Sequence, residues 1–339
     1  MILSRANAKE TLKLAILRLQ EAGINSAILD AEVLLAFAIK KPKEYLYAHP
    51  EAKISHGQLR LFQNLIARRA KHEPVAYLTG HKEFFGLDFV VNHNVLIPRP
   101  ETELMVEEAL KIIKSDPLSL SHPTLARIAS RKGEKLLIDI GTGSGCIPIA
   151  VVKNSGVRAI AIDSSATALT VAKKNAKMHK IMDSSRKRGA TSLSGGLRFL
   201  LGDLLKPILN SKFQIPNSQF IVITANLPYL PTDEWRHTPV DVKKYEPREA
   251  LDGGKDGLKY YWKLLPQIKN LAEITRTPII CLFEFCPEQK SELKKLVKEC
   301  FLNPSSPPLR KGRINTAVKI KKDLAGRDRL LILQLTTDN

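Results

Sequence analysis

The chain has 339 residues, 44% of them hydrophobic, which is enough for one large domain or two ordinary domains with a sizeable core. Its 53 Lys and Arg residues against 34 Asp and Glu give a formal net charge of +19, typical of a polyanionic partner or of solubilising surface charge. The four cysteines form no CxxC pair or zinc-finger spacing, and no stretch has the length of a membrane span or a signal-peptide core. We therefore expect a cytoplasmic protein without disulfides.

The first part of the chain is predicted to be helical. Residues 1–73 carry apolar side chains at helical spacing, interrupted by glycine and proline, and are expected to form a small bundle with a structural or partner-recognition role. Residues 74–97 place aromatic and β-branched residues around Gly86 and are predicted to form a β-hairpin that links this domain to a second one, residues 98–339.

The second domain is predicted to alternate strands and helices. Such alternation is typical of an α/β fold with a mainly parallel sheet and helices on both faces, and the last two strands, without a helix between them, indicate an antiparallel end. Segments 114–135 and 183–196, rich in serine and basic residues, are predicted to be loops. The seven expected strands are 136–140, 157–162, 197–201, 220–225, 278–283, 314–320 and 329–335.

A glycine-rich turn follows the first of these strands and predicts a nucleoside-binding site. Glycines at such a turn let the backbone bend tightly and approach a ligand, and Asp163, at the end of the next strand, can accept hydrogen bonds from both ribose hydroxyls. The spacing G-x-G-x-G differs from the dinucleotide pattern G-x-G-x-x-G, which places pyrophosphate at a helix N-terminus. It therefore favours S-adenosylmethionine, which has no phosphate, over NAD. The turn consists of Gly141, Thr142, Gly143, Ser144 and Gly145.

Two residues after the third strand are candidates for contact with the adenine. Asp203 can accept a hydrogen bond from its exocyclic amine, and Leu204 can pack on the ring. An acid in a solvated loop is the alternative interpretation of Asp203.

The chemical site is predicted at Asn226, Leu227, Pro228 and Tyr229, which follow the fourth strand. Ligands of an open parallel sheet bind beyond the carboxyl ends of its strands, where the strand order reverses, so Asn226 is expected beside the glycine turn. Its side-chain oxygen and the carbonyl of Leu227 can accept the two N–H groups of a planar amine or amide, which lets the nitrogen pyramidalise as it attacks a sulfonium methyl. Tyr229 can stack on the planar group, and no metal is required.

Three other functions remain open from the residues alone. A nucleic-acid methyltransferase acting on adenine N6 or guanine N2 would use the same chemistry and would suit the positive charge. A non-catalytic S-adenosylmethionine-binding protein would retain the fold, and an NAD-dependent oxidoreductase is disfavoured by the glycine spacing.

At these residues the sequence resembles the peptide-chain release factor glutamine methyltransferases, the HemK/PrmC-like protein-(glutamine-N5) methyltransferases, over most of its length. The resemblance is carried by the tetrapeptide, the glycine turn and five further strings. The most specific are Ile97-Pro98-Arg99-Pro100-Glu101-Thr102-Glu103 and Gly253-Gly254-Lys255-Asp256-Gly257-Leu258; the others are Gly80–Leu87, Tyr245–Leu251 and Asp323–Arg329.

The resemblance implies a Rossmann-like class I methyltransferase that methylates the glutamine of the Gly-Gly-Gln motif in class-one release factors. It implies that Gly141–Gly145 and Asp163 hold S-adenosylmethionine and that Asn226 contacts both cofactor and glutamine. It also implies that residues 1–73 recognise and bind the release factor. We expect action near the ribosome, no membrane, no sequence-specific nucleic acid and a monomer.

Two residues depart from the family pattern. Leu227 stands where proline is usual, but the expected acceptor is its backbone carbonyl, which any residue supplies. Leu204 stands where many members carry a tryptophan, so an apolar contact with the adenine is kept and stacking area is lost.

Overall fold

The computed structural model describes residues 7–114, 134–181, 196–210, 215, 218–302 and 314–337. These residues divide into two compact units. The first contains Met1–His81, Val91–His93 and Thr238–Glu246, and the second contains Lys82–Val90, Asn94–His237 and Pro247–Asn339. In the described part of the chain, no helix has the length and apolar character needed to cross a bilayer.

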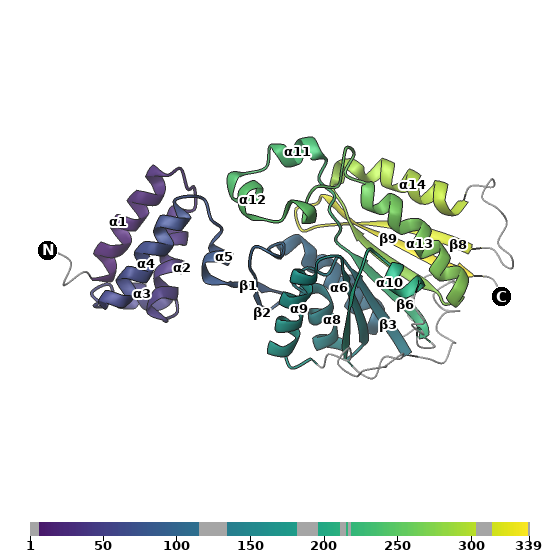
Figure 1. The fold of residues 1–339 in the computed structure, drawn as a ribbon, viewed down its shortest axis with the longest axis horizontal. Helices are drawn as coiled ribbons and strands as arrows, with labels where there is room; N and C mark the ends of the chain where they lie inside the picture. The colour runs from purple at the N-terminus through teal and green to yellow at the C-terminus, as the bar shows by residue number, and fades with distance from the viewer. Residues whose placement is uncertain are drawn as a thin grey trace. The chain divides into compact units, whose positions relative to one another are not determined.

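The first unit is a helical bundle, as predicted for this part of the chain (Figure 1). Side-chain caps explain where two of its helices begin, because Asn7 accepts a hydrogen bond from the amide of Glu10, and Ser55 and Gln58 form a reciprocal capping box. Apolar side chains of five helices form its core, including Leu19, Leu34, Leu35, Leu46, Phe62, Leu65 and Leu78. Its helices are α1 (Ala8–Glu21), α2 (Ala27–Ile39), α3 (Glu44–Ala48), α4 (His56–Arg69) and α5 (Val75–Thr79).

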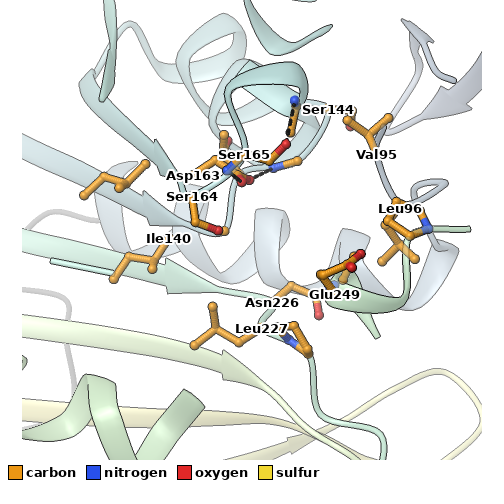
Figure 2. A pocket seen from close by; sticks show the side chains of 18 of the residues that line it. Val95, Leu96, Ile140, Ser144, Asp163, Ser164, Ser165, Asn226, Leu227 and Glu249 are labelled. Atoms are coloured by element: carbon orange, nitrogen blue, oxygen red, sulfur yellow. Dashed lines mark hydrogen bonds between the residues drawn. The ribbon is translucent and has the colours of Figure 1, made fainter. Parts of the chain in front are cut away.

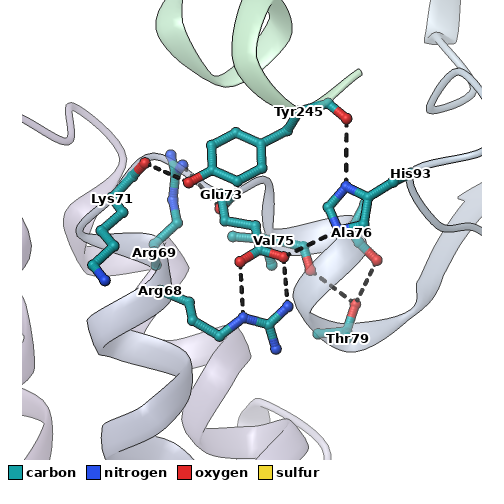
Figure 3. Close-up of polar contacts among 9 residues, drawn as sticks. All are labelled: Arg68, Arg69, Lys71, Glu73, Val75, Ala76, Thr79, His93 and Tyr245. Atoms are coloured by element: carbon teal, nitrogen blue, oxygen red, sulfur yellow. Dashed lines mark hydrogen bonds and ion pairs between the residues drawn. The ribbon is translucent and has the colours of Figure 1, made fainter. Parts of the chain in front are cut away.

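A segment that is distant in sequence also belongs to this unit (Figure 3). The short helix α12 (Val240–Tyr245) ends with a tyrosine whose hydroxyl donates to the carbonyl oxygen of Lys71, 2.7 Å away. Near it, Glu73 accepts from Arg68 Nε at 2.8 Å and lies 3.4 Å from the ring of His93. The expected boundaries 1–73, 74–97 and 98–339 did not include this segment in the helical part, and their functional division stays a prediction.

The predicted hairpin is present as a two-stranded sheet of β1 (His81–Phe84) and β2 (Leu87–Val90). Its two turn residues, Phe85 and Gly86, have φ angles of 53° and 69°, which is the conformation that matches the twist of a tight hairpin. Glutamate carboxylates hold both turn amides: Phe85 N donates to Glu103 and Gly86 N to Glu83, at 2.8 and 2.6 Å.

The second unit is built on a seven-stranded sheet in the order β5-β4-β3-β6-β7-β9-β8, which confirms the predicted fold. The first five strands in sequence are parallel, whereas β9 is antiparallel to β7 and to β8. Because β3 lies between β4 and β6, the strand order reverses there, as expected. The strands are β3 (Glu134–Ile140), β4 (Arg158–Asp163), β5 (Leu197–Leu201), β6 (Ser218–Ala225), β7 (Ile279–Glu284), β8 (Ile314–Lys322) and β9 (Asp328–Thr337).

Helices cover both faces of this sheet, which explains why its central strands read as continuous apolar runs (Figure 1). On one face lie α6 (Glu103–Lys114), α8 (Cys146–Ser155) and α9 (Ala166–Met178). On the other lie α10 (Lys206–Leu209), α13 (Lys259–Thr275) and α14 (Lys290–Leu302).

Helix α13 was not specified by the sequence analysis, although Leu264, Leu265, Ile268 and Leu271 have helical spacing and are buried. Pro266 lies inside this helix and removes one backbone donor. Most of the predicted loops 114–135 and 183–196 lies outside the described residues.

Candidate active site

A cavity of about 470 Å³ opens at the carboxyl ends of the central strands in the second unit (Figure 2). Its volume is typical of a small-molecule site. Ten of the predicted site residues line it, whereas Gly145 and Tyr229 do not. The ten are Gly141, Thr142, Gly143, Ser144, Asp163, Asp203, Leu204, Asn226, Leu227 and Pro228.

The glycine turn needs its glycines for different reasons. Gly141, Gly143 and Gly145 have φ angles of 72°, 54° and 79°, which side-chain-bearing residues adopt at a cost. A Cβ on Gly145 would lie 3.1 Å from Cβ of Ala172 in helix α9, so this glycine allows close helix packing. A Cβ on Gly141 would lie 3.1 Å from Leu227 Cδ2, so the turn contacts the tetrapeptide directly.

The carboxylate of Asp163 both shapes the turn and faces the cavity. Its Oδ2 accepts from the amide of Gly143 and its Oδ1 from the amide of Ser165, each at 2.8 Å. Each carboxylate oxygen has a second lone-pair site, so both can still accept from ligand hydroxyls. Burial raises the pKa of Asp163 above its ordinary value of 3.8, and the backbone hydrogen bonds oppose this shift.

We expect cofactor affinity to fall as the pH is lowered through the raised pKa of Asp163, because only the ionised carboxylate accepts from both ribose hydroxyls without bearing a proton. Titration calorimetry with S-adenosylmethionine across acidic pH measures this. The variant Asp163→Asn should bind roughly ten- to hundredfold more weakly, because an NH2 group would face an amide N–H.

A second buried carboxyl, that of Asp139, lies beneath the turn and can also titrate in this range. The pH titration therefore has to be repeated with Asp163→Asn as a control. Burial raises the pKa of Asp139 to about 6, and its Oδ1 accepts from Thr224 Oγ1 at 2.7 Å. Acid-range pH dependence that persists in Asp163→Asn belongs to other groups, of which Asp139 lies directly beneath the turn. Affinity of the wild type that does not change with acid pH would contradict the assignment of Asp163.

The two candidate adenine contacts follow β5, whose last residue, Leu201, pairs with Asp163 of β4. Asp203 pairs with Lys206 at 2.7 Å, so only part of its acceptor capacity faces the cavity. Leu204 has a φ of 54° and is 6% exposed, and its side chain lines the cavity as an apolar surface. Contact of Asp203 and Leu204 with the adenine stays a prediction.

Asn226 lies across the cavity from Asp163, at the end of β6 (Figure 2). Its Nδ2 donates to Thr102 Oγ1 at 3.0 Å. The amide nitrogen is thereby engaged with the protein, and the side-chain oxygen Oδ1 is the atom left to accept from a ligand.

Tyr229 does not line the cavity, and its described contacts lie with the protein. Its hydroxyl donates to Glu284 Oε1 at 3.2 Å, and its backbone oxygen accepts from Gln289 Nε2 at 2.7 Å. Burial, followed by the charge of Glu284, raises the pKa of its hydroxyl, which remains protonated as a donor. The described contacts make Tyr229 an anchor of the tetrapeptide, and stacking on a substrate stays a prediction.

The Gly-Gly-x-Asp-Gly-Leu string lies directly against the tetrapeptide. A Cβ on Gly257 would lie 2.1 Å from the carbonyl oxygen of Tyr229, and one on Gly253 would lie 2.6 Å from that of Pro228. Gln289 joins the two segments, because its Nε2 also donates to the carbonyl oxygen of Asp256 at 3.0 Å. These glycines are therefore required so that one backbone can pack on another.

Sequence reasoning missed several residues of the cavity. Thr102 was quoted only as part of a family string, and Glu249, whose carboxylate points into the cavity in Figure 2, was not singled out. Both residues lie in strings that carry the family resemblance, but nothing in those strings indicates a role for them before the fold is known. Further lining residues of this kind are Val95, Leu96, Pro98, Arg99, Pro247, Ala250 and Tyr260.

The chain is similar to curated proteins along most of its length. It is 35% identical, over 73% of its residues, to the release factor glutamine methyltransferase of Geobacter sulfurreducens, of which 74% is covered. It is 31% identical, over 97% of its residues, to that of Nitratidesulfovibrio vulgaris, of which 95% is covered. Residues 10–80 match the family described as the PrmC N-terminal domain, and residues 121–194 match ribosomal protein L11 methyltransferase (PrmA).

Among solved structures, the hMettl16 catalytic domain in complex with MAT2A 3′UTR hairpin 1 has 14% sequence identity and a TM-score of 0.47. That match covers 89% of this chain and 90% of the other.

Proposed function

The chain belongs to the release factor glutamine methyltransferases, and from this premise we propose that the loop Asn226–Tyr229 holds the glutamine side chain that receives the methyl group. The protein is a methyltransferase that uses S-adenosylmethionine and acts on glutamine in release factors. The finer assignment to the Gly-Gly-Gln motif of class-one factors is part of our proposal.

The observation that carries the site assignment is the position of Asn226. It lines the same cavity as Gly141–Ser144 and Asp163, and its Nδ2 is already bound to Thr102. Its Oδ1 can therefore accept one N–H of the glutamine amide, while the carbonyl of Leu227 accepts the other. Two acceptors fix the nitrogen and let its lone pair turn toward an electrophile.

The cavity fits S-adenosylmethionine in size and in the donor and acceptor groups that it offers. Asp163 retains lone pairs for ribose hydroxyls, the positive-φ glycines allow close backbone approach, and Leu204 offers an apolar surface. When bound, the cofactor supplies an electrophilic methyl group on a sulfonium. The residues of this chain would orient the amide nitrogen to take the methyl group as its bond to sulfur breaks and a thioether leaves, and the nitrogen would then lose a proton to solvent.

We also propose that the helical unit recognises the release factor and that the protein acts as a cytoplasmic monomer near the ribosome. The support is the match of residues 10–80 to the PrmC N-terminal domain and the substrate itself, which works in translation. Sedimentation of the purified protein alone and with release factor measures the oligomeric state.

The test of this function is a transfer assay with labelled S-adenosylmethionine and three acceptors. These are a purified release factor, the same factor with Gln→Ala in its Gly-Gly-Gln motif, and ribosomal or duplex nucleic acid. We expect label on the first alone. Equal label on the Gln→Ala factor would refute the glutamine assignment, and label on nucleic acid alone would favour an exocyclic amine as acceptor.

A further inference from the structure

We infer that Thr102 and Glu284 are positioning residues that determine which end of the Asn226 amide faces the substrate. This inference rests on the proposed function of Asn226. It assigns a role to two buried polar side chains, 3% and 1% exposed, that come from segments distant in sequence.

The need for such residues follows from the shape of an amide. The oxygen and NH2 group of an asparagine side chain have nearly the same size, so rotation by half a turn exchanges them at little steric cost. Only the oxygen can accept from a glutamine NH2 group. The reversed amide would present a donor to a donor, so the orientation of Asn226 has to be fixed before the substrate binds.

Thr102 is the residue that contacts the other end of this amide. It lies at the end of the short helix η1 (Pro100–Thr102), and its Oγ1 accepts from Asn226 Nδ2 at 3.0 Å. A threonine hydroxyl carries one proton and can also donate. If it donated that proton to Asn226, the amide would have to reverse, so the acceptor of the Thr102 proton determines the orientation of Asn226.

Glu284 provides that acceptor. Its Oε1 receives the hydroxyl of Tyr229 at 3.2 Å, whereas its Oε2 is buried and meets no donor in good hydrogen-bond geometry within the described residues. This buried oxygen is where we place the hydroxyl proton of Thr102, and an interaction with Thr102 is among those that lower the pKa of the carboxyl. A hydroxyl proton can turn about the Cβ–Oγ bond, so that of Thr102 can be directed toward Glu284 while Oγ1 accepts from Asn226.

The carboxyl group has to be ionised to act in this way. Burial raises the pKa of Glu284, and the charge of Arg329 and the hydrogen bonds from Thr102 and Tyr229 oppose that shift. The result is a polar chain from Glu284 through Thr102 to Asn226. Because Tyr229 also donates to Glu284, one carboxylate holds both ends of the tetrapeptide.

The test compares Thr102→Val, which removes the hydroxyl at nearly constant shape, with Thr102→Ser, which keeps it. We expect kcat for release factor methylation to fall roughly ten- to hundredfold in Thr102→Val. This loss is smaller than the one expected for Asn226→Ala, which removes the acceptor itself. In Thr102→Ser it should remain within a few-fold of wild type. Calorimetry should show that both variants still bind S-adenosylmethionine, which separates orientation of the acceptor from loss of the fold.

Glu284→Gln tests the first member of the polar series from Glu284 through Thr102 to Asn226, with Glu108→Gln as its matched control. Glu108 is a buried carboxyl on α6 that pairs with Lys321 and does not line the cavity. We expect kcat to fall at least about tenfold for Glu284→Gln and to stay near wild type for Glu108→Gln. Since Glu284 acts through Thr102, adding Glu284→Gln to Thr102→Val should lower kcat by much less than Glu284→Gln does alone.

The outcomes separate the two proposals. A wild-type protein that does not methylate release factor overturns the proposed function. An active wild type with undiminished kcat in Thr102→Val, or with fully independent effects in the double variant, overturns the role of Thr102 and Glu284 and leaves the proposed function intact. Equal loss in Thr102→Ser and Thr102→Val also overturns it, because the hydroxyl would then not matter.

Discussion

Replacing Asn226 by alanine is expected to reduce methyl transfer roughly 100- to 1000-fold while binding of S-adenosylmethionine remains measurable. The substitution removes the Oδ1 acceptor that orients the glutamine nitrogen. In our proposal most of the cofactor contacts come from other segments that line the cavity, namely the turn Gly141–Ser144 and the carboxylate of Asp163, and these stay in place. Steady-state kinetics with release factor, together with calorimetry of cofactor binding, measures both effects.

The control for this substitution is Asn154→Ala. The Asn154 side chain donates to the carbonyl oxygen of Ala150 within helix α8 and does not line the cavity. It loses the same number of atoms, so transfer near the wild-type rate is expected. An Asn226→Ala variant with full activity would refute the assignment of the chemical site.

Replacing Gly257 by alanine is expected to lower the free energy of unfolding by about 2–5 kcal/mol and transfer by about 100-fold. The added Cβ would lie 2.1 Å from both the Tyr229 carbonyl oxygen and Gln289 Nε2, and the φ of Gly257 is +73°. The clash can be relieved only by moving the backbone of the tetrapeptide, because one of the two opposing atoms is a main-chain oxygen. Chemical denaturation and the transfer assay measure the two losses.

Gly326→Ala separates the steric clash from the backbone strain. Gly326 has nearly the same φ, +76°, but an added Cβ meets nothing within 4 Å. It should therefore show only the cost of a left-handed conformation, about 1–2 kcal/mol, with transfer unaffected. If Gly257→Ala were as stable and as active as Gly326→Ala, the close packing of the two loops would not position the site.

The sheet was predictable because its information is local. Buried runs such as 136–140 and 220–225 are apolar at all but one position each, and this pattern identifies a parallel strand that is covered on both faces. The reversal of strand order then placed Asn226 beside the glycine turn without any knowledge of side-chain contacts.

The supporting contacts were not predictable because they join residues far apart in the chain. Asn226 and Thr102 are separated by 124 positions, and Tyr229 and Glu284 by 55. No local pattern reports such pairs, so the contacts that anchor Tyr229 were not foreseen, and its stacking on the substrate stays a prediction. The inclusion of Thr238–Glu246 in the helical unit has the same cause, because it depends on Tyr245 meeting the backbone of Lys71.

The most direct test of this account is tandem mass spectrometry of a release factor after incubation with the protein and S-adenosylmethionine. We expect one added methyl group, with fragment ions that place it on the side-chain nitrogen of the glutamine in the Gly-Gly-Gln motif. The Asn226→Ala variant should leave that residue unmodified. A methyl group on another residue of the release factor, or one that forms equally with Asn226→Ala, would contradict the account.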